Sequence, residues 1–188
     1  MDKFAHDRIL IGMILSLGVA HLLKGIAKLI EHPSRTKPYA VHLLWVLYTF
    51  LLLINFWWWE FRLGKIVQWT FGTYVFVILY ITVYYIICSL LFPEDLKEYR
   101  DFKDYYYARG KWFFALLAAV FLLDLGDTLI KGKEYFTALG TEYPIRIVSH
   151  TVLCLLAIKI KKEWFHMLLV VVFILYGISW IVRTYGVQ

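Results

Sequence analysis

Cysteine and proline are scarce in this sequence, which has two cysteines and four prolines in 188 residues. Cys88 and Cys154 both fall inside apolar segments, and no CxxC pair is present. Neither a disulfide framework nor a thiol zinc site is therefore indicated. The GxSxG, Walker-type, GxGxxG and HExxH motifs are also absent, so nucleophile elbows, phosphate loops and zincin sites have no local support.

Apolar residues dominate what is present. They make up 61% of the chain, and aromatic residues make up 19%, whereas roughly 45–50% apolar residues is usual for a soluble domain. The excess must face lipid, and the aromatic residues fit belts at the two membrane surfaces. The length allows one domain, so we expect residues 1–188 to form a single integral membrane domain.

Six segments approach the length of about 20 mostly apolar residues that a membrane-spanning helix needs. The stretches HPSRTKP and GKEYFTALGTEYP separate two pairs of these segments, and Pro93 ends another. The predicted spans are roughly residues 8–30, 39–61, 66–92, 111–130, 144–160 and 164–183. The sequence therefore predicts an all-α, polytopic transmembrane helix bundle of about six spans.

The first predicted span could be mistaken for a secretory signal, because a charged start precedes its apolar run. No A-x-A cleavage site follows, and the apolar pattern continues past Lys24, so we expect a retained span. Gly12, Ser16 and Ala20 form a small-xxx-small series that allows close approach of another helix. That helix belongs either to the same chain or to a second copy in a homo-oligomer.

The connection PEDLKEYRDFKDYYYARG, residues 93–110, mixes charged and apolar residues. Leu96, Tyr99, Phe102 and Tyr106 recur at helical spacing, which fits an amphipathic helix lying in the membrane plane between spans three and four. A solvated helical arm fits the charges equally well. In either form, this segment is the candidate contact for a protein partner.

The chain carries a formal net charge of +6. Its basic residues lie at the ends of apolar segments and do not form one patch, so the expected partners are anionic lipid headgroups, not nucleic acid. Lys and Arg are richer on the side that contains residues 24–37, 97–111 and 159–162. The positive-inside rule then places this side in the cytoplasm and both termini outside a plasma (inner) membrane.

Two aspartates interrupt the fourth predicted span. Twelve mostly apolar residues starting at Trp112 place Asp124 roughly 18 Å into the bilayer. An ionised aspartate at the centre of a spanning helix costs about 2.5 to 3.5 kcal/mol, so it needs a partner or water. Asp124, Thr128 and Lys131 share one helix face, with Asp127 beside them. This polar stripe is the most costly feature of the sequence.

Arg146 is the expected counter-charge of both aspartates, because it lies in the first turn of the fifth predicted span at the level of Asp127. Glu60 and Arg183 end other predicted spans at the same level. Such a set predicts either a vestibule that handles cations or protons or an ion-pair lock that fixes helix packing.

The histidines form two groups by depth. His21 and His150 lie about ten residues from the predicted cytoplasmic helix ends, and His42 and His166 lie within about one turn of that side. Lys24 shares a helix face with His21. His21 and His150 are candidates for a proton relay at the midplane. As a less favoured alternative, the four histidines would ligate haem b, although no single span carries two well-separated ligands.

Three hypotheses follow. In the leading one, the protein conducts, transports or senses a cation or proton through a polar interior containing Asp124, Asp127, Arg146, His21 and His150. In the second, it is a non-enzymatic structural or effector subunit whose buried charges lock the helices. In the third, it is a b-type haem electron-transfer protein. No enzymatic activity is favoured, no other metal is assigned, and outside the haem hypothesis no cofactor is expected.

Overall fold

The computed structural model describes residues 3–32, 37–60 and 70–185. Helices account for 86% of these residues, and none of them lies in a strand. The predicted all-α, polytopic helical bundle is thereby confirmed. Residue 61 of the second predicted span and residues 66–69 of the third lie outside the described residues.

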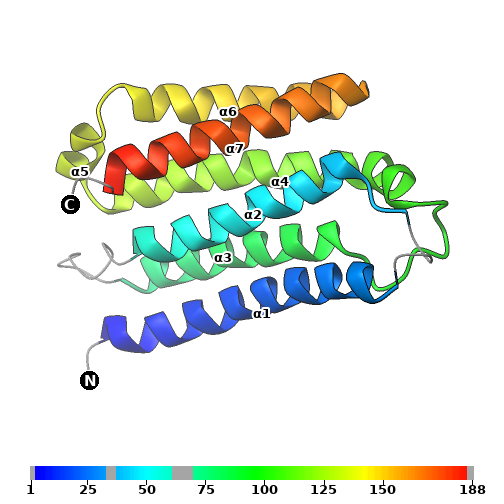
Figure 1. Ribbon diagram of the computed structural model, residues 1–188. Coiled ribbons are helices and arrows are strands. Elements are labelled where there is room, and N and C mark those ends of the chain that lie inside the picture. Colours follow the sequence, from blue (N-terminus) through cyan, green and yellow to red (C-terminus); the bar gives the residue numbers. More distant parts are fainter. Residues whose placement is uncertain (1–2, 33–36, 61–69, 186–188) are drawn as a thin grey trace.

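Within the described residues, six long helices and one short helix follow one another along the chain. They are α1 (Lys3–Glu31), α2 (Ala40–Trp59), α3 (Phe71–Leu91), α4 (Phe102–Ile130), α5 (Lys133–Ala138), α6 (Glu142–Lys159) and α7 (Glu163–Tyr185). The long helices run antiparallel to their neighbours in sequence, so α1 begins and α7 ends at the same end of the bundle (Figure 1). We call this the termini end, and the opposite end, which carries residues 92–101, the loop end.

Five of the described helices, α1, α2, α3, α4 and α7, are long and apolar enough to cross a membrane. The chain therefore has the features of an integral membrane protein. The predicted span at 144–160 corresponds to α6, which does not meet this criterion, so the span count is about five. The reason is its composition, because Glu142, Arg146, His150 and Lys159 lower the hydropathy of an 18-residue helix that packs along α4.

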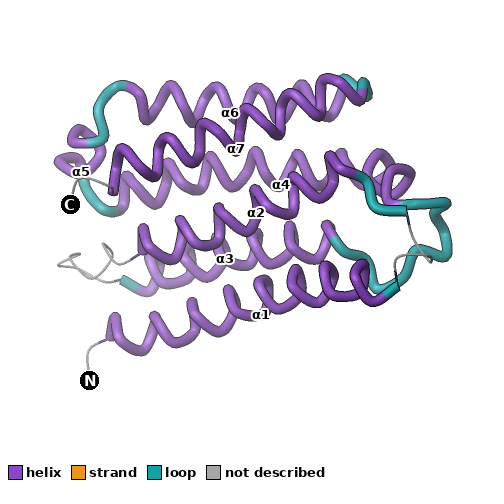
Figure 2. The backbone as a smooth tube through the Cα atoms, viewed as in Figure 1, coloured by secondary structure: helices purple, strands orange, loops and turns teal. Residues whose placement is uncertain are grey.

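The predicted in-plane helix between the third and fourth spans is not formed. Residues 93–101 are turns and bends without a helix, as the loop after α3 in Figure 2 shows. The following residues belong to α4, which starts at Phe102 and not at residue 111. Asp101 caps this helix, because its side chain accepts a hydrogen bond of 2.9 Å from the backbone N–H of Asp104. The charges near this end had concealed the first turns of a long spanning helix.

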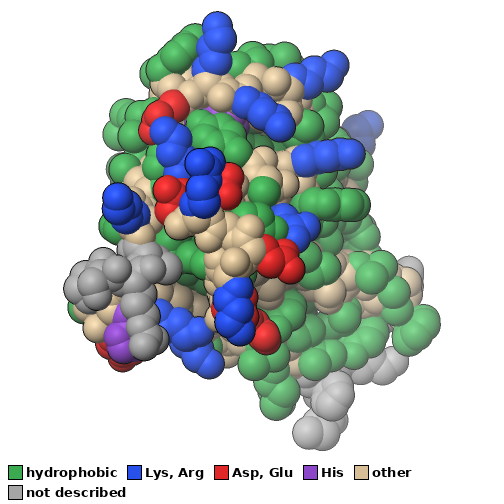
Figure 3. Space-filling view, turned by 90° about the vertical axis from the view of Figure 1, so that its right-hand side faces the viewer, with side chains coloured by type: hydrophobic (Ala, Val, Ile, Leu, Met, Phe, Trp, Pro, Cys, Tyr) green, Lys and Arg blue, Asp and Glu red, His purple; other side chains and the backbone are tan. Residues whose placement is uncertain are grey.

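The loop end is the basic end of the bundle. Lys and Arg side chains gather over it (Figure 3), and Lys97, Arg100, Lys103 and Lys111 are exposed in this region. This is the side that the positive-inside rule assigns to the cytoplasm. The orientation of the chain in a membrane stays a prediction.

A layer of aromatic side chains fills the middle of the core between α2, α4, α6 and α7. Trp45 contacts Phe113, Phe114 and Phe173 edge-on, with ring centroids 5.2–5.6 Å apart. Phe121 continues the layer against Phe173. We call these five residues the aromatic layer, and all of them are buried. Their packing places apolar side chains between the two ends of the bundle.

The carboxyl end of α3 is held by side chains from three other helices. The main-chain carbonyls of residues 90–92 accept hydrogen bonds from Tyr105, His42 and His21, in that order, at 2.7, 2.6 and 2.7 Å. The last carbonyls of a helix have no partner within the helix, and lipid offers none. Tyr105, His42 and His21 therefore allow α3 to end inside the bundle, just before Pro93.

Replacing His42 by Phe keeps an aromatic ring against α3 but removes the donor to the Leu91 carbonyl. We expect the free energy of unfolding to fall by about 1–3 kcal/mol, the cost of a buried polar group left without a partner. The measurement is an SDS titration of the detergent-purified protein. The matched control is His32→Phe, an exposed position at the same end. Equal stabilities of the two variants would contradict the assigned role of His42.

Candidate functional site

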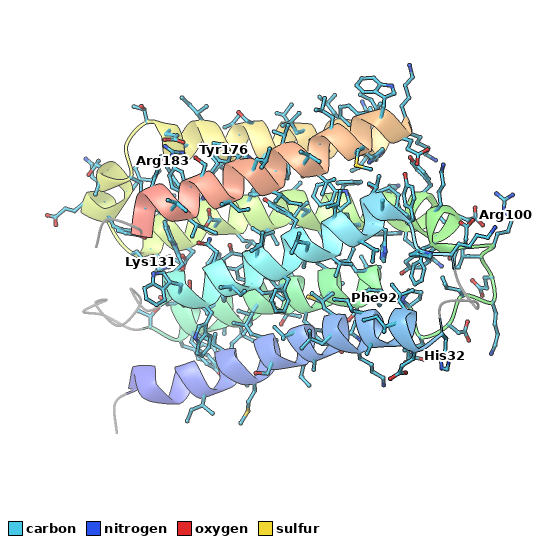
Figure 4. The ribbon with its side chains drawn as sticks, viewed as in Figure 1. His32, Phe92, Arg100, Lys131, Tyr176 and Arg183 are labelled. Atoms are coloured by element: carbon cyan, nitrogen blue, oxygen red, sulfur yellow. The ribbon has the colours of Figure 1, made fainter. Side chains whose placement is uncertain are left out.

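A buried group of two carboxylates and one ammonium lies at the termini end. Glu60 caps the end of α2, Asp127 lies in the last turn of α4, and Lys131 caps that helix. The Lys131 ammonium bonds Asp127 Oδ2 and lies 3.1 Å from Glu60 Oε1. The three side chains are only 6%, 1% and 2% exposed. We call them the acid cluster, and Figure 4 labels Lys131 within it.

The acid cluster has one more negative group than positive ones. Two ionised carboxylates and one ammonium give a formal charge of −1 on three side chains that are at most 6% exposed. Glu60 Oε2 is also buried and has no hydrogen-bond partner among the described residues, whereas the Trp59 side chain is a further hydrogen-bond partner of Asp127. Burial, with the Asp127 carboxylate beside it, raises the pKa of Glu60 to about 8, against the attraction of Lys131. Glu60 lies just after the α2 span. Because its pKa is raised, it is expected to hold a proton near neutral pH.

A second ion pair lies deeper and is balanced. Arg146 donates to Asp124 Oδ2 at 2.8 Å, and its guanidinium lies 4.6 Å from the centre of the Trp180 ring. The Tyr143 hydroxyl donates to the Asp124 carbonyl at 2.9 Å and is bonded to the Thr128 hydroxyl at 2.7 Å. Because one carboxylate meets one guanidinium, this group joins α4 to α6 without excess charge.

A third pair lies at the surface of the same end. Arg183 on α7 forms two hydrogen bonds of 2.7 Å with Glu142 at the start of α6. Tyr176 donates to the same carboxylate at 2.9 Å, and Figure 4 labels Tyr176 and Arg183 on α7. The Arg183 guanidinium holds the pKa of Glu142 at about 2. This carboxylate stays ionised at any physiological pH, in contrast to Glu60.

The structure pairs the two aspartates with different cations. Arg146, expected as the counter-charge of both, bonds Asp124, whereas Lys131 neutralises Asp127. The sequence places Lys131 in the polar stripe of α4, and the structure adds it to the site. The signal that identifies it is the i,i+4 spacing from Asp127, which brings the two side chains together on one helix face.

A small cavity of about 30 Å³ lies beside the balanced pair, between α2, α4, α6 and α7. Arg146, His150, Asn55, Tyr48 and Tyr176 contribute its polar lining. Arg146 Nε and Asn55 Oδ1 are buried without a hydrogen-bond partner among the described residues. The polarity and size suit one ordered water, which would extend the polar region from Arg146 to His150.

The four histidines occupy separate places. His21 and His42 hold the end of α3, and His166 Nε2 donates at 2.8 Å to the carbonyl of Ile160, which caps α6. His150 Nδ1 donates at 2.8 Å to the Arg146 carbonyl one turn earlier on α6. Within the described residues, no contact joins His21 to His150. The proposed relay would thus need intermediates.

These contacts also bear on the haem hypothesis. Each of the four rings spends an N–H on a main-chain carbonyl, and His166 also accepts from the Tyr106 hydroxyl at 2.8 Å. Aromatic rings enclose His150 and His166 on several sides. This packing places His150 and His166 within the aromatic core, and the haem hypothesis stays a prediction. Lys24, predicted beside His21, is exposed and lines a cavity at the loop end.

The balanced pair can be tested by a double-mutant cycle. Asp124→Asn or Arg146→Gln alone leaves one buried charge without its partner, which costs about 3–5 kcal/mol of unfolding free energy. The double variant removes both charges, and we expect it to be more stable than either single variant. As a comparison, the half-exposed pair Glu142→Gln and Arg183→Gln should show a coupling of about 0–1 kcal/mol. Additive losses at Asp124 and Arg146 would show that no lock exists.

Comparison with protein-family models, with curated proteins and with solved structures finds no match to this chain. Among the described residues, no group of three or more His, Cys, Asp and Glu side chains is arranged to hold a metal ion. The geometry of the described residues is therefore what indicates the chemistry of the site. Of the three charged groups, the acid cluster is the one whose buried charges are not balanced within the described residues.

Proposed function

We propose that the protein binds and releases a proton at the acid cluster, as a membrane sensor or transporter of protons. The observation that carries this proposal is the formal charge of −1 on Glu60, Asp127 and Lys131, whose side chains are all nearly inaccessible. An unpaired ion in such a region costs several kcal/mol. A single bound proton removes the imbalance.

A proton suits this place better than a metal ion. The Lys131 ammonium already lies between the two carboxylates, within hydrogen-bond distance of both. A metal ion would need that central position and several oxygen ligands. A proton needs only one carboxylate oxygen, and Glu60 Oε2 is an acceptor that no described residue uses. Binding of a cation other than a proton at this cluster is therefore less well supported.

Access to the cluster is one-sided. The aromatic layer lies between the polar groups of the two ends, because Phe121 and Phe173 contact His150 while Phe114 contacts His166. Trp45, Phe114 and Phe173 are fully buried in it. Protons would enter and leave at the termini end. Sensing needs no more than this, whereas transport needs a second conformation in which the layer opens.

A structural or effector role is the second candidate. The balanced Asp124–Arg146 pair favours it, because such a pair gains nothing from exchanging a proton and joins α4 to α6. Both roles can coexist in one chain, since the pair and the acid cluster use different carboxylates. The experiments must therefore change Glu60 and Asp127 separately from Asp124.

Glu60→Gln tests the function directly, because it leaves one carboxylate and one ammonium and hence a balanced cluster that is expected to fold. We expect proton uptake by proteoliposomes, followed with an enclosed pH dye, to fall at least tenfold if transport occurs. If the protein is a sensor, the pH-dependent carboxyl signal in infrared difference spectra should disappear instead. Glu98→Gln, an exposed change at the loop end, is the control. Unchanged uptake and an unchanged infrared signal in Glu60→Gln would refute the proposal.

Stability should depend on pH through the same carboxyl. The pKa of Glu60 is raised from the ordinary 4.5 to about 8 in the fold, so the folded chain binds more protons than the unfolded chain between these values. The contribution of the Glu60 carboxyl to the free energy of unfolding is then fully present below pH 4.5 and is lost as the pH rises through about 8. SDS titrations across this range should show the decline in the native chain and in Glu98→Gln, but not in Glu60→Gln. A decline of equal size in all three chains would assign it to other groups.

A further inference from the structure

A cavity of about 510 Å³ opens at the loop end, away from the acid cluster. It lies between the last turns of α1 and the connection that follows α3. Figure 4 labels His32 and Phe92, two of its lining residues, at this end of the bundle. The proposed function leaves this cavity without a role.

The α1 wall of the cavity carries a row of basic groups. His21, Lys24, Lys28 and His32 follow one another at i, i+3, i+7 and i+11, so they share a helix face. The ammonium groups of Lys24 and Lys28 form no ion pair with another described residue. Two cations thus face the same cavity without an ion-pair partner among the described residues.

The opposite charge is present as well. Glu31 and Glu94 line the cavity and form no ion pair within the described part of the chain, whereas Asp95 is paired with Lys97 at 3.1 Å. Among the described lining residues, the charged groups without an ion pair are therefore two ammoniums and two carboxylates. Their sum is zero, which matches a ligand that carries one group of each sign better than a simple anion.

We propose that this cavity binds the headgroup of a phospholipid that carries a phosphate and a primary ammonium, as phosphatidylethanolamine does. Lys24 and Lys28 bind the phosphate, and Glu31 and Glu94 accept from the ammonium. His21 is fixed by its 2.7 Å hydrogen bond to the Phe92 carbonyl and shapes the wall of the cavity.

Exposed apolar side chains continue the basic row along α1 toward the middle of the bundle, and they favour a lipid over a soluble molecule as the ligand. Met13 and Leu17 lie on the same face as Lys24 and Lys28, and they are 59% and 60% exposed. Leu17 is about 10 Å deeper than Lys24 along the helix. Acyl chains attached to a bound headgroup would lie over these two side chains, in the α1 span. A free phosphate compound would gain nothing from them.

The test is binding of short-chain phosphatidylethanolamine, phosphatidylcholine and phosphatidylglycerol to the detergent-purified protein, read out by native mass spectrometry. We expect phosphatidylethanolamine to bind about tenfold more tightly than the other two. Lys24→Gln/Lys28→Gln should weaken its binding about tenfold or more, because each lysine contributes an attraction to the phosphate. The control is Lys159→Gln/Lys161→Gln, which removes two exposed charges outside the cavity.

A second pair of variants separates the two halves of the headgroup. Glu31→Gln/Glu94→Gln should abolish the preference for phosphatidylethanolamine over phosphatidylglycerol and leave phosphate binding intact. The proposal is overturned if phosphatidylglycerol binds native protein as tightly as phosphatidylethanolamine. It is equally overturned if inorganic phosphate displaces the lipid at similar concentrations, or if the lysine variants bind like the control. Glu60→Gln should bind lipid normally, so failure here and failure of the proton proposal are distinguishable.

Discussion

Every polar group that leaves water among these apolar helices needs a partner supplied by the protein, and this requirement organises both ends of the bundle. At the loop end, the carbonyls that finish α3 are satisfied by side chains of α1, α2 and α4. His166 does the same for the carbonyl at the end of α6. Since lipid offers no hydrogen bonds, helices can end within the bundle only where such donors are present. Three of the four buried or partly buried histidines are explained in this way.

The same requirement divides the charged groups at the termini end into those whose charges balance and one whose charges do not. Asp124 with Arg146 is a closed arrangement, because each charge has its opposite within hydrogen-bond distance. Glu60, Asp127 and Lys131 are joined by hydrogen bonds, but their charges do not balance and Glu60 Oε2 has no partner among the described residues. A buried imbalance of one charge has no structural benefit, since an apolar residue in place of Glu60 would avoid its cost. The imbalance is therefore the strongest sign of function in the described part of the chain.

The sequence predicts the helices well because long apolar runs permit little else in a membrane. It predicts two costly aspartates for the same reason. It fails at their partners, because depth along a helix can be counted from the sequence whereas the rotation of one helix against another depends on packing. The i,i+4 spacing on α4 already brings Lys131 to Asp127, whereas only the fold shows that Arg146 of α6 faces Asp124. The sequence does not reveal the start of α4, because the buried Phe102 and Tyr106 of its first turns stand among charged residues and no continuous apolar run marks them.

Helix α2 connects the polar groups at the two ends of the bundle. At one end His42 holds the end of α3, and at the other end Glu60 is bound to Lys131 of α4. In the proposal, a proton on Glu60 replaces its ion pair with Lys131 by a contact to a neutral carboxyl and leaves Lys131 paired with Asp127, so the contact between α2 and α4 changes. Trp45, in the middle of the same helix, packs within the aromatic layer. If the proposed protonation of Glu60 shifts α2, that shift would therefore act on the layer that separates the two ends.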